Sequence, residues 1–87
     1  MMSTHIIEVF DCLLFPSRNK IRAELEFLGV SVIDEKIVEK TGSVKFYVNL
    51  RVLDNKTEEK LLVGLKNSGA LTGKDPVVKR VTRGVYP

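Results

Sequence analysis

Apolar and polar side chains alternate along the segment from Ser43 to Leu53, and this alternation limits the fold more than any other feature of the chain. The apolar parity holds Val44, Phe46, Val48, Leu50 and Val52, and the polar parity holds Lys45, Tyr47, Asn49 and Arg51. A period of two is typical of a β-strand that has one face on a core and the other face outside it. The chain must therefore contain a sheet, together with elements that cover one face of that sheet.

Three other segments have the composition of strands: Thr4 to Leu14, Val30 to Lys40 and Val77 to Tyr86. The first is apolar on both parities, which predicts a central strand. The last has mixed parity and contains Gly84, which suits an edge strand.

A hairpin is predicted between the second and third strands, because Lys40-Thr41-Gly42-Ser43 has turn composition and Gly42 can adopt a positive φ at little cost. The apolar alternation before this turn changes phase at Ile33-Asp34. A β-bulge at that point would reconcile the two phases.

The clearest helix is predicted after Phe15-Pro16-Ser17, which interrupts the first strand. Ser17 is the expected N-cap, because its hydroxyl can accept from an unpaired backbone N–H of the first turn. The expected buried stripe consists of Ile21, Leu25 and Leu28, broadened by Ala23 and Phe27. Gly29 is expected to end this helix in a left-handed conformation.

A second helix is predicted after Asp54 or Asn55, the two alternative N-caps, with Glu58 placed to reach back to the cap. Its buried stripe is expected to be Leu61, Leu62 and Leu65, with Val63 beside it and Gly69 closing the helix.

The predicted order of strand, helix, strand, strand, helix and strand indicates an α+β fold of the ferredoxin-like βαββαβ type. Right-handed crossovers would place both helices on one face of a four-stranded antiparallel sheet. The whole chain, residues 1–87, is expected to form this single domain. A chain of 87 residues builds only one modest core, and dimerisation is one common source of added stability for such a domain.

The first apolar segment contains Glu8 and Asp11 and follows no basic region, which argues against a signal peptide or a membrane span. Cytoplasmic residence is therefore expected. The single cysteine, Cys12, excludes an intramolecular disulfide framework and a multi-cysteine metal site, and it is interpreted as a small buried thiol.

The formal net charge of +3 is too small to indicate a nucleic-acid-binding protein, so the distribution of the cations matters more than their number. Arg18, Lys20 and Arg22 lie at the start of the first predicted helix, where the helix dipole disfavours them. A bound phosphate or carboxylate would reverse that cost, with Ser17 and Asn19 as further donors. The alternative is a solvated face with the helical ion pairs Arg22–Glu26 and Lys20–Glu24.

Lys45, Tyr47 and Arg51 share the polar face of the third strand, and helices on one side only would leave this face open. An aromatic ring between cations is an arrangement on which a base can stack while its phosphate is neutralised. Burial in a dimer and plain exposure to solvent are the alternatives. Lys79 and Arg80 add positive charge on the last strand.

Asp11 interrupts the first strand near its end and is the candidate Mg²⁺ ligand and catalytic residue. The alternatives are a cap on the loop at Pro16 or an ion pair with Arg18. His5, the single histidine, has no catalytic partner at a telling spacing and is interpreted as structural or exposed.

The segments Val9-Phe10-Asp11-Cys12-Leu13 and Arg18-Asn19-Lys20-Ile21, followed by Leu25, Leu28 and Gly29, resemble the small CRISPR-associated dimeric endoribonucleases and their virulence-associated and antitoxin relatives. The resemblance covers roughly the first third of the chain. It implies a ferredoxin-like dimer in which Asp11 is placed on a shared metal at the two-fold axis. The segment Lys74 to Val81 is similar to the basic last strand of a ferredoxin-like ribosomal protein.

The leading functional hypothesis is a small dimeric protein that binds nucleic acid, with RNA favoured over DNA, through the cations named above. Catalysis would require a metal at Asp11. The alternative is a non-enzymatic interaction or regulatory module, such as a phage- or plasmid-type inhibitor, that pairs through an edge strand or the open sheet face. A small-ligand regulatory domain is a third hypothesis.

Overall fold

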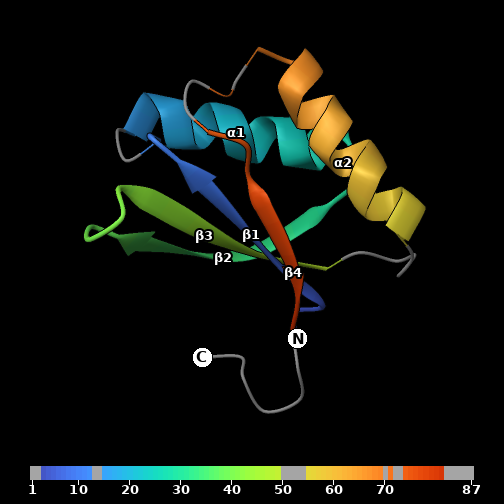
Figure 1. Ribbon diagram of the computed structural model, residues 1–87, viewed down its shortest axis with the longest axis horizontal. Coiled ribbons are helices and arrows are strands. Elements are labelled where there is room, and N and C mark those ends of the chain that lie inside the picture. Colours follow the sequence, from blue (N-terminus) through green and yellow to red (C-terminus); the bar gives the residue numbers. More distant parts are fainter. Residues whose placement is uncertain (1–2, 13–14, 50–54, 70, 72–73, 82–87) are drawn as a thin grey trace.

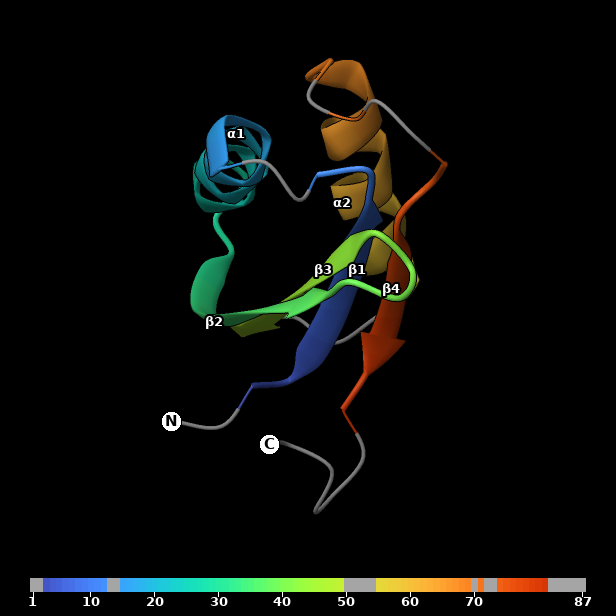
Figure 2. The same ribbon diagram turned by 90° about the vertical axis from the view of Figure 1, so that its left-hand side faces the viewer.

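The computed structural model describes residues 3–12, 15–49, 55–69, 71 and 74–81. Its elements are β1 (His5–Phe10), α1 (Phe15–Phe27), β2 (Ser31–Val38), β3 (Ser43–Asn49), α2 (Asn55–Asn67) and β4 (Val77–Arg80). The four strands form one sheet in the order β2-β3-β1-β4, and all neighbouring strands are antiparallel. Both helices lie on the same face of this sheet (Figures 1 and 2). The result is a two-layer α+β domain that is compatible with the ferredoxin-like architecture.

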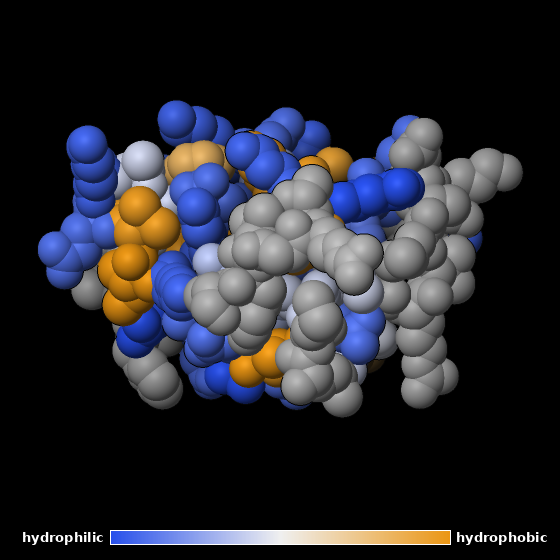
Figure 3. Space-filling model, turned by 90° about the horizontal axis from the view of Figure 1, so that it is seen from below, coloured by the Kyte–Doolittle hydropathy of each residue, from blue (hydrophilic) through white to orange (hydrophobic). Residues whose placement is uncertain are grey.

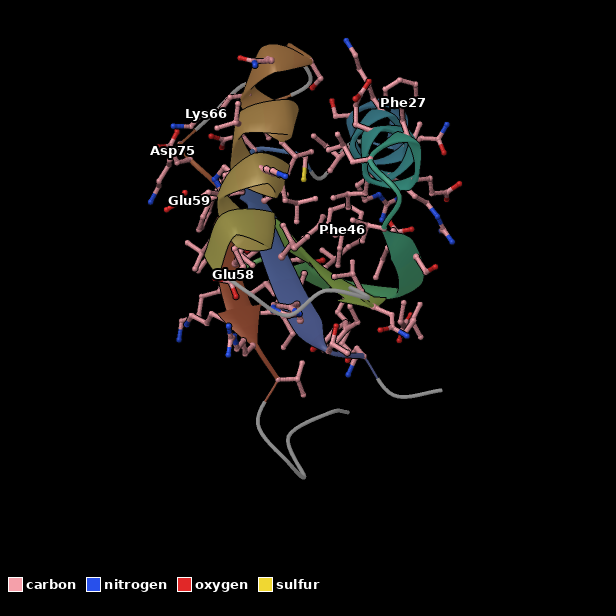
Figure 4. The ribbon with its side chains drawn as sticks, turned by 90° about the vertical axis from the view of Figure 1, so that its right-hand side faces the viewer. Phe27, Phe46, Glu58, Glu59, Lys66 and Asp75 are labelled. Atoms are coloured by element: carbon pink, nitrogen blue, oxygen red, sulfur yellow. The ribbon has the colours of Figure 1, made fainter. Side chains whose placement is uncertain are left out.

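The core lies between the helices and the sheet, where Phe46 is seen in Figure 4. Alternate residues of the two central strands point into it, as the period of two predicts. The fully buried members are Ile7 and Val9 of β1, Ile21 and Leu25 of α1, Val44, Phe46 and Val48 of β3, and Leu65 of α2. The remaining two members of the predicted apolar parity, Leu50 and Val52, lie outside the described residues.

The hairpin and its irregularity follow the prediction. Gly42 has φ +66° in the turn between β2 and β3. The pairing of these strands shifts between Val32 and Asp34, so Ile33 is the extra residue of a β-bulge. After the bulge, Glu35 lies opposite Phe46 and therefore points to the helices. Asp34 lies opposite Tyr47 and therefore points to the other side of the sheet.

The end of α1 also follows the prediction. Gly29 has φ +87° and donates its N–H to Glu26, while Val30 donates to Leu25, both at 3.0 Å. These two bonds form a Schellman motif, and the buried Val30 and Leu25 side chains belong to the same core.

The start of α1 differs from the prediction. The helix begins at Phe15, so Ser17 lies in the first turn and is not the N-cap. Proline is tolerated in a first turn, because its missing N–H would have no intrahelical partner there. The helix was expected to begin only after Pro16, but it includes this residue. The first strand is also shorter than predicted and ends at Phe10, because Asp11 adopts a left-handed φ of 58°.

The expectation that Ala23 and Phe27 broaden the buried stripe of α1 is wrong. Phe27 is 84% exposed and Ala23 is exposed as well. Each lies two residues from Leu25, and two residues correspond to about 200° around a helix, which turns them away from the sheet. Leu28 is partly exposed and packs on α2, where a Cβ built on Gly64 would lie 2.9 Å from its methyl groups.

Candidate functional site: the outer sheet face

We call the face of the sheet turned away from both helices the outer sheet face (Figure 2). The strand register places side chains from all four strands on it. Seen from below, the described residues of the surface are a mixture of hydrophilic and hydrophobic ones (Figure 3). Cross-strand register identifies its members, because directly opposite residues point to the same side. Lys45 of β3 lies opposite Lys36 of β2 and also opposite Glu8 of β1. Tyr47 lies opposite Ile6 of β1, which in turn lies opposite Lys79 of β4.

The charges of this face are arranged unevenly. Its two carboxylates are engaged in local hydrogen bonds: Glu8 accepts from the Ser43 hydroxyl at 2.6 Å and Asp34 accepts from the Glu35 N–H at 2.8 Å. Among the described residues, no carboxylate lies within ion-pair distance of the three lysines of this face, Lys36, Lys45 and Lys79. The face therefore presents cations that nothing in the described part of the chain neutralises by contact.

Tyr47 does not offer the free ring that the sequence analysis expected. Its side chain is only 7% exposed, and the Nζ of Lys36 lies 5.5 Å from its ring centroid in a cation–π contact. A base could stack on this ring only after Lys36 had moved. Arg51, the third predicted member of this group, lies outside the described residues.

The predicted cations lie at the start of α1, but carboxylates neutralise part of their charge. Arg18, Asn19, Arg22 and Glu35 line a hollow of about 260 Å³ between this helix and β2. Arg22 contacts Glu35 at 2.6 Å and Glu26 at 3.3 Å, so the predicted helical pair with Glu26 is confirmed and a second acid is added. Arg22 is therefore not a free cation for a ligand.

The remaining predicted residues of α1 are Ser17, which is half-buried, and Lys20, which is exposed. The predicted pair between Lys20 and Glu24 is not formed, although both residues lie in the described part of the chain. Arg80 of β4 is exposed and binds Glu58 at 3.2 Å, so it too has a carboxylate partner.

Asp11 lies directly after β1, is exposed and donates its backbone N–H to Gly42 at 2.9 Å. The described residues contain no group of three His, Cys, Asp or Glu side chains that could hold a metal ion. A single carboxylate does not satisfy Mg²⁺, which takes several oxygen ligands. Asp11 therefore does not by itself fit the shared-metal role that the family resemblance implies.

His5 forms a cluster that the sequence analysis missed. Its ring is 1% exposed, with Nδ1 3.0 Å from the Thr4 hydroxyl and Nε2 3.2 Å from Glu58 of α2. A carboxylate can only accept, so Nε2 is assigned the proton that it donates to Glu58. The pKa of the Glu58 carboxyl lies below its usual 4.5, chiefly because of the hydrogen bond from Arg80. Partial burial raises this pKa, and the hydrogen bond with His5 lowers it.

This His5 cluster ties β1, α2 and β4 together at one end of the sheet, and Glu58 lies at that end of α2 in Figure 4. A hydroxyl, an imidazole and a carboxylate in a row resemble a nucleophilic triad. The imidazole is buried, however, and cannot reach a substrate, which favours a structural role. Its carboxylate partner lies 53 positions away, so no local spacing could have identified it.

Cys12 is the buried thiol that the sequence predicted, with 3% exposure and a hydrogen bond to the Val9 carbonyl at 3.3 Å. Burial raises the pKa of this thiol above its usual 9.0. The hydrogen bond from Val44 and the charge of Arg18 lower the pKa, but their effect is smaller. A neutral, enclosed thiol is a poor nucleophile.

Comparisons with protein-family models, with curated proteins and with solved structures found no match to this chain. Among the described residues, no helix combines the length and the apolar character that a membrane crossing requires.

Proposed function

We propose that the protein is a ferredoxin-like domain that binds the phosphate backbone of nucleic acid, RNA in the first place, on its outer sheet face. The strand order β2-β3-β1-β4 with antiparallel neighbours supports this fold assignment. The observation that carries the function is the group of Lys36, Lys45 and Lys79, which share the face turned away from the helices and have no carboxylate in ion-pair contact among the described residues.

The pairing of Lys36 with Lys45 strengthens this proposal. Like charges directly opposite each other on one sheet face destabilise the pairing of two strands. A phosphate held between the two ammonium groups would turn this repulsion into attraction, through charge-assisted hydrogen bonds. Because the Tyr47 ring is covered, little reading of base identity is expected, and binding should depend weakly on sequence.

The experiment is a titration of single-stranded RNA at two salt concentrations. Three neutralised phosphates on a single strand give a slope of about −2 in log affinity against log salt. Affinity should therefore fall about 20-fold between about 50 and about 200 mM salt. Lys45→Gln and Lys79→Gln should each lower the affinity and reduce the slope by about 0.7.

Lys66→Gln is the matched control, because it removes the same charge from an exposed lysine of α2 that is paired with Asp75 at 3.0 Å. It should leave RNA binding nearly unchanged. Affinity that does not respond to salt, or that falls equally in the control, would contradict the proposal. The same titration with double-stranded DNA tests the preference for RNA.

Cleavage is the further activity that the family resemblance implies, and it would rest on Asp11 with Mg²⁺. The test is RNA incubated with and without Mg²⁺ on the wild type and on Asp11→Asn. Mg²⁺-dependent cleavage that the variant loses would support the enzyme. Cleavage that persists in the variant would point to contamination.

A second candidate function is a non-enzymatic interaction module that pairs through the edge of the sheet. The observation in its favour is Ile37, which is 48% exposed on the edge strand β2. An unpaired edge can accept a strand from another protein, although the charged Asp34, Glu35 and Lys36 oppose this. Capture of a single protein partner that survives nuclease treatment, and is lost in Ile37→Lys, would favour this function over the first.

A further inference from the structure

The outer sheet face carries a second aromatic ring, that of Phe10, which the proposed binding of the phosphate backbone does not use. Phe10 is the last residue of β1 and directly follows the buried Val9, so its side chain points away from the core and the helices. It lies opposite Ser43 and is partly exposed, whereas Tyr47 on the same face is only 7% exposed. Of these two rings, Phe10 is therefore the more accessible one.

A lysine lies over the Phe10 ring. The Nζ of Lys74, in the segment before β4, is 4.8 Å from the ring centroid, and Lys74 is exposed. Among the described residues, no carboxylate is in ion-pair contact with Lys74, because the neighbouring Asp75 binds Lys66 instead, at 3.0 Å. One face of the ring is therefore within reach of a group from an exposed side chain, and the group that occupies it is a cation.

A nucleic-acid base can take the place of this ammonium group. An exposed cation–π contact favours the closed arrangement by only about 2- to 5-fold. A base that stacks on an aromatic side chain adds about 5- to 150-fold to the affinity of a single strand. The exchange of the Lys74 ammonium for a base therefore favours binding. The Tyr47 ring does not offer the same exchange, because it is almost fully buried.

Phe10 lies next to a cation of the proposed backbone site. Its cross-strand partner is Ser43, and Lys45 is two residues further along β3, on the same face of the sheet. Diagonal neighbours of this kind are about 7 to 8 Å apart. One nucleotide can therefore place its base on the Phe10 ring and its phosphate at the Lys45 ammonium group.

We infer that Phe10 is the base-stacking residue of the outer sheet face, so that the bound strand has an unpaired base at this point. A base inside a duplex is stacked between its neighbours and has no free face for the ring, whereas unpaired bases are stacked on aromatic side chains by many RNA-binding proteins. Stacking accepts every base, which agrees with the weak dependence on sequence expected above. The inference rests on the proposed function, because the strand must lie on this face.

The test compares the affinity of the full chain for two RNA strands, an oligouridine and a strand of the same length in which stable abasic residues replace the uridines. Both strands carry the same phosphates, so the lysines contribute equally to both, and the ratio of the two affinities reports the bases alone. The wild type should bind the oligouridine at least about 5-fold more tightly. Phe10→Leu should remove this preference by weakening only the oligouridine complex, and Phe10→Tyr, which keeps the ring, should retain it.

Ile6→Leu is the matched control, because Ile6 is another partly exposed apolar residue on the same side of β1 and the change conserves its volume. It should leave the preference within about 2-fold of the wild type. Should Phe10→Leu fail to fold, Phe10→Met takes its place in the same titration.

Each outcome decides the inference. A preference for the oligouridine that Phe10→Leu removes, and that Phe10→Tyr and Ile6→Leu retain, supports it. Equal affinity of the wild type for both strands overturns it, while binding that still falls with salt leaves the proposed function standing. A preference that Phe10→Leu leaves unchanged, or that Ile6→Leu also removes, overturns it as well. Binding of neither strand contradicts the proposed function, and the inference falls with it.

Discussion

Replacement of Glu58 by alanine tests whether the His5 cluster stabilises the fold. Glu58 accepts hydrogen bonds from the buried His5 and from Arg80, which is 55% exposed. An alanine leaves the Nε2 of His5 without its partner in a ring that is 1% exposed. An unpaired buried polar group costs about 1 to 3 kcal/mol, whereas loss of the exposed ion pair with Arg80 costs at most about 1 kcal/mol. The free energy of unfolding should therefore fall by about 2 kcal/mol at pH 7.

The assay is urea unfolding followed by far-ultraviolet circular dichroism at several pH values. Glu59→Ala is the control, because it makes the same change at the neighbouring helical position, where the side chain is exposed and lies outside the cluster (Figure 4). Its effect should stay within about 0.5 kcal/mol, as for most surface substitutions. Equal stability of the Glu58→Ala and Glu59→Ala proteins at pH 7 would refute a stabilising His5 cluster.

The pH dependence gives an independent check on Glu58. The pKa of its carboxyl is lower in the folded protein than the 4.5 of the free side chain, chiefly because of the bond from Arg80. The folded state therefore holds the proton less tightly than the unfolded state, so this contribution to stability is complete above pH 4.5 and is lost as the pH falls through the folded-state pKa. The difference between wild type and Glu58→Ala should narrow over that acidic range. A difference that stays constant down to acid would contradict the assignment.

Three further changes test other parts of the fold. At Asp11, where φ is 58°, Asp11→Gly should be more stable than Asp11→Ala by about 1 kcal/mol in thermal unfolding, because glycine adopts the left-handed conformation without strain. Gly64→Ala should change stability by less than about 0.5 kcal/mol, because the gain in helix propensity is offset by contact with Leu28, but should stabilise a Leu28→Ala protein by about 1 kcal/mol. A gain of equal size in both backgrounds would argue against that contact. The Cys12 thiol should react with a disulfide reagent at pH 8 far more slowly in the folded protein than in urea, and equal rates would show that it is not enclosed.

Local patterns in the sequence were sufficient for the features that depend on a few neighbouring residues. The Gly29 cap, the Gly42 turn and the bulge at Ile33 each follow from the chemistry or the parity of a short segment. The exposure of Phe27 could also have been predicted, because its angle from Leu25 is fixed by the helix.

The contacts between distant segments could not be predicted in this way. Arg22 was expected to pair with Glu26 one turn away, but its shorter contact is to Glu35 on another element. Tyr47 was expected to be open, yet the side chain of Lys36 on the neighbouring strand lies over its ring. Such pairings depend on strand register and helix placement, which a single sequence does not specify at the level of individual side chains.

These contacts also decide how salt should act on the proposed binding of nucleic acid. The lysines of the outer sheet face lack carboxylate contacts among the described residues. Nucleic-acid binding releases counterions and should lose about 20-fold in affinity between about 50 and about 200 mM salt. Affinity that stayed constant over this range would show that these lysines do not contact phosphate, and the assignment of the outer sheet face to nucleic acid would be wrong.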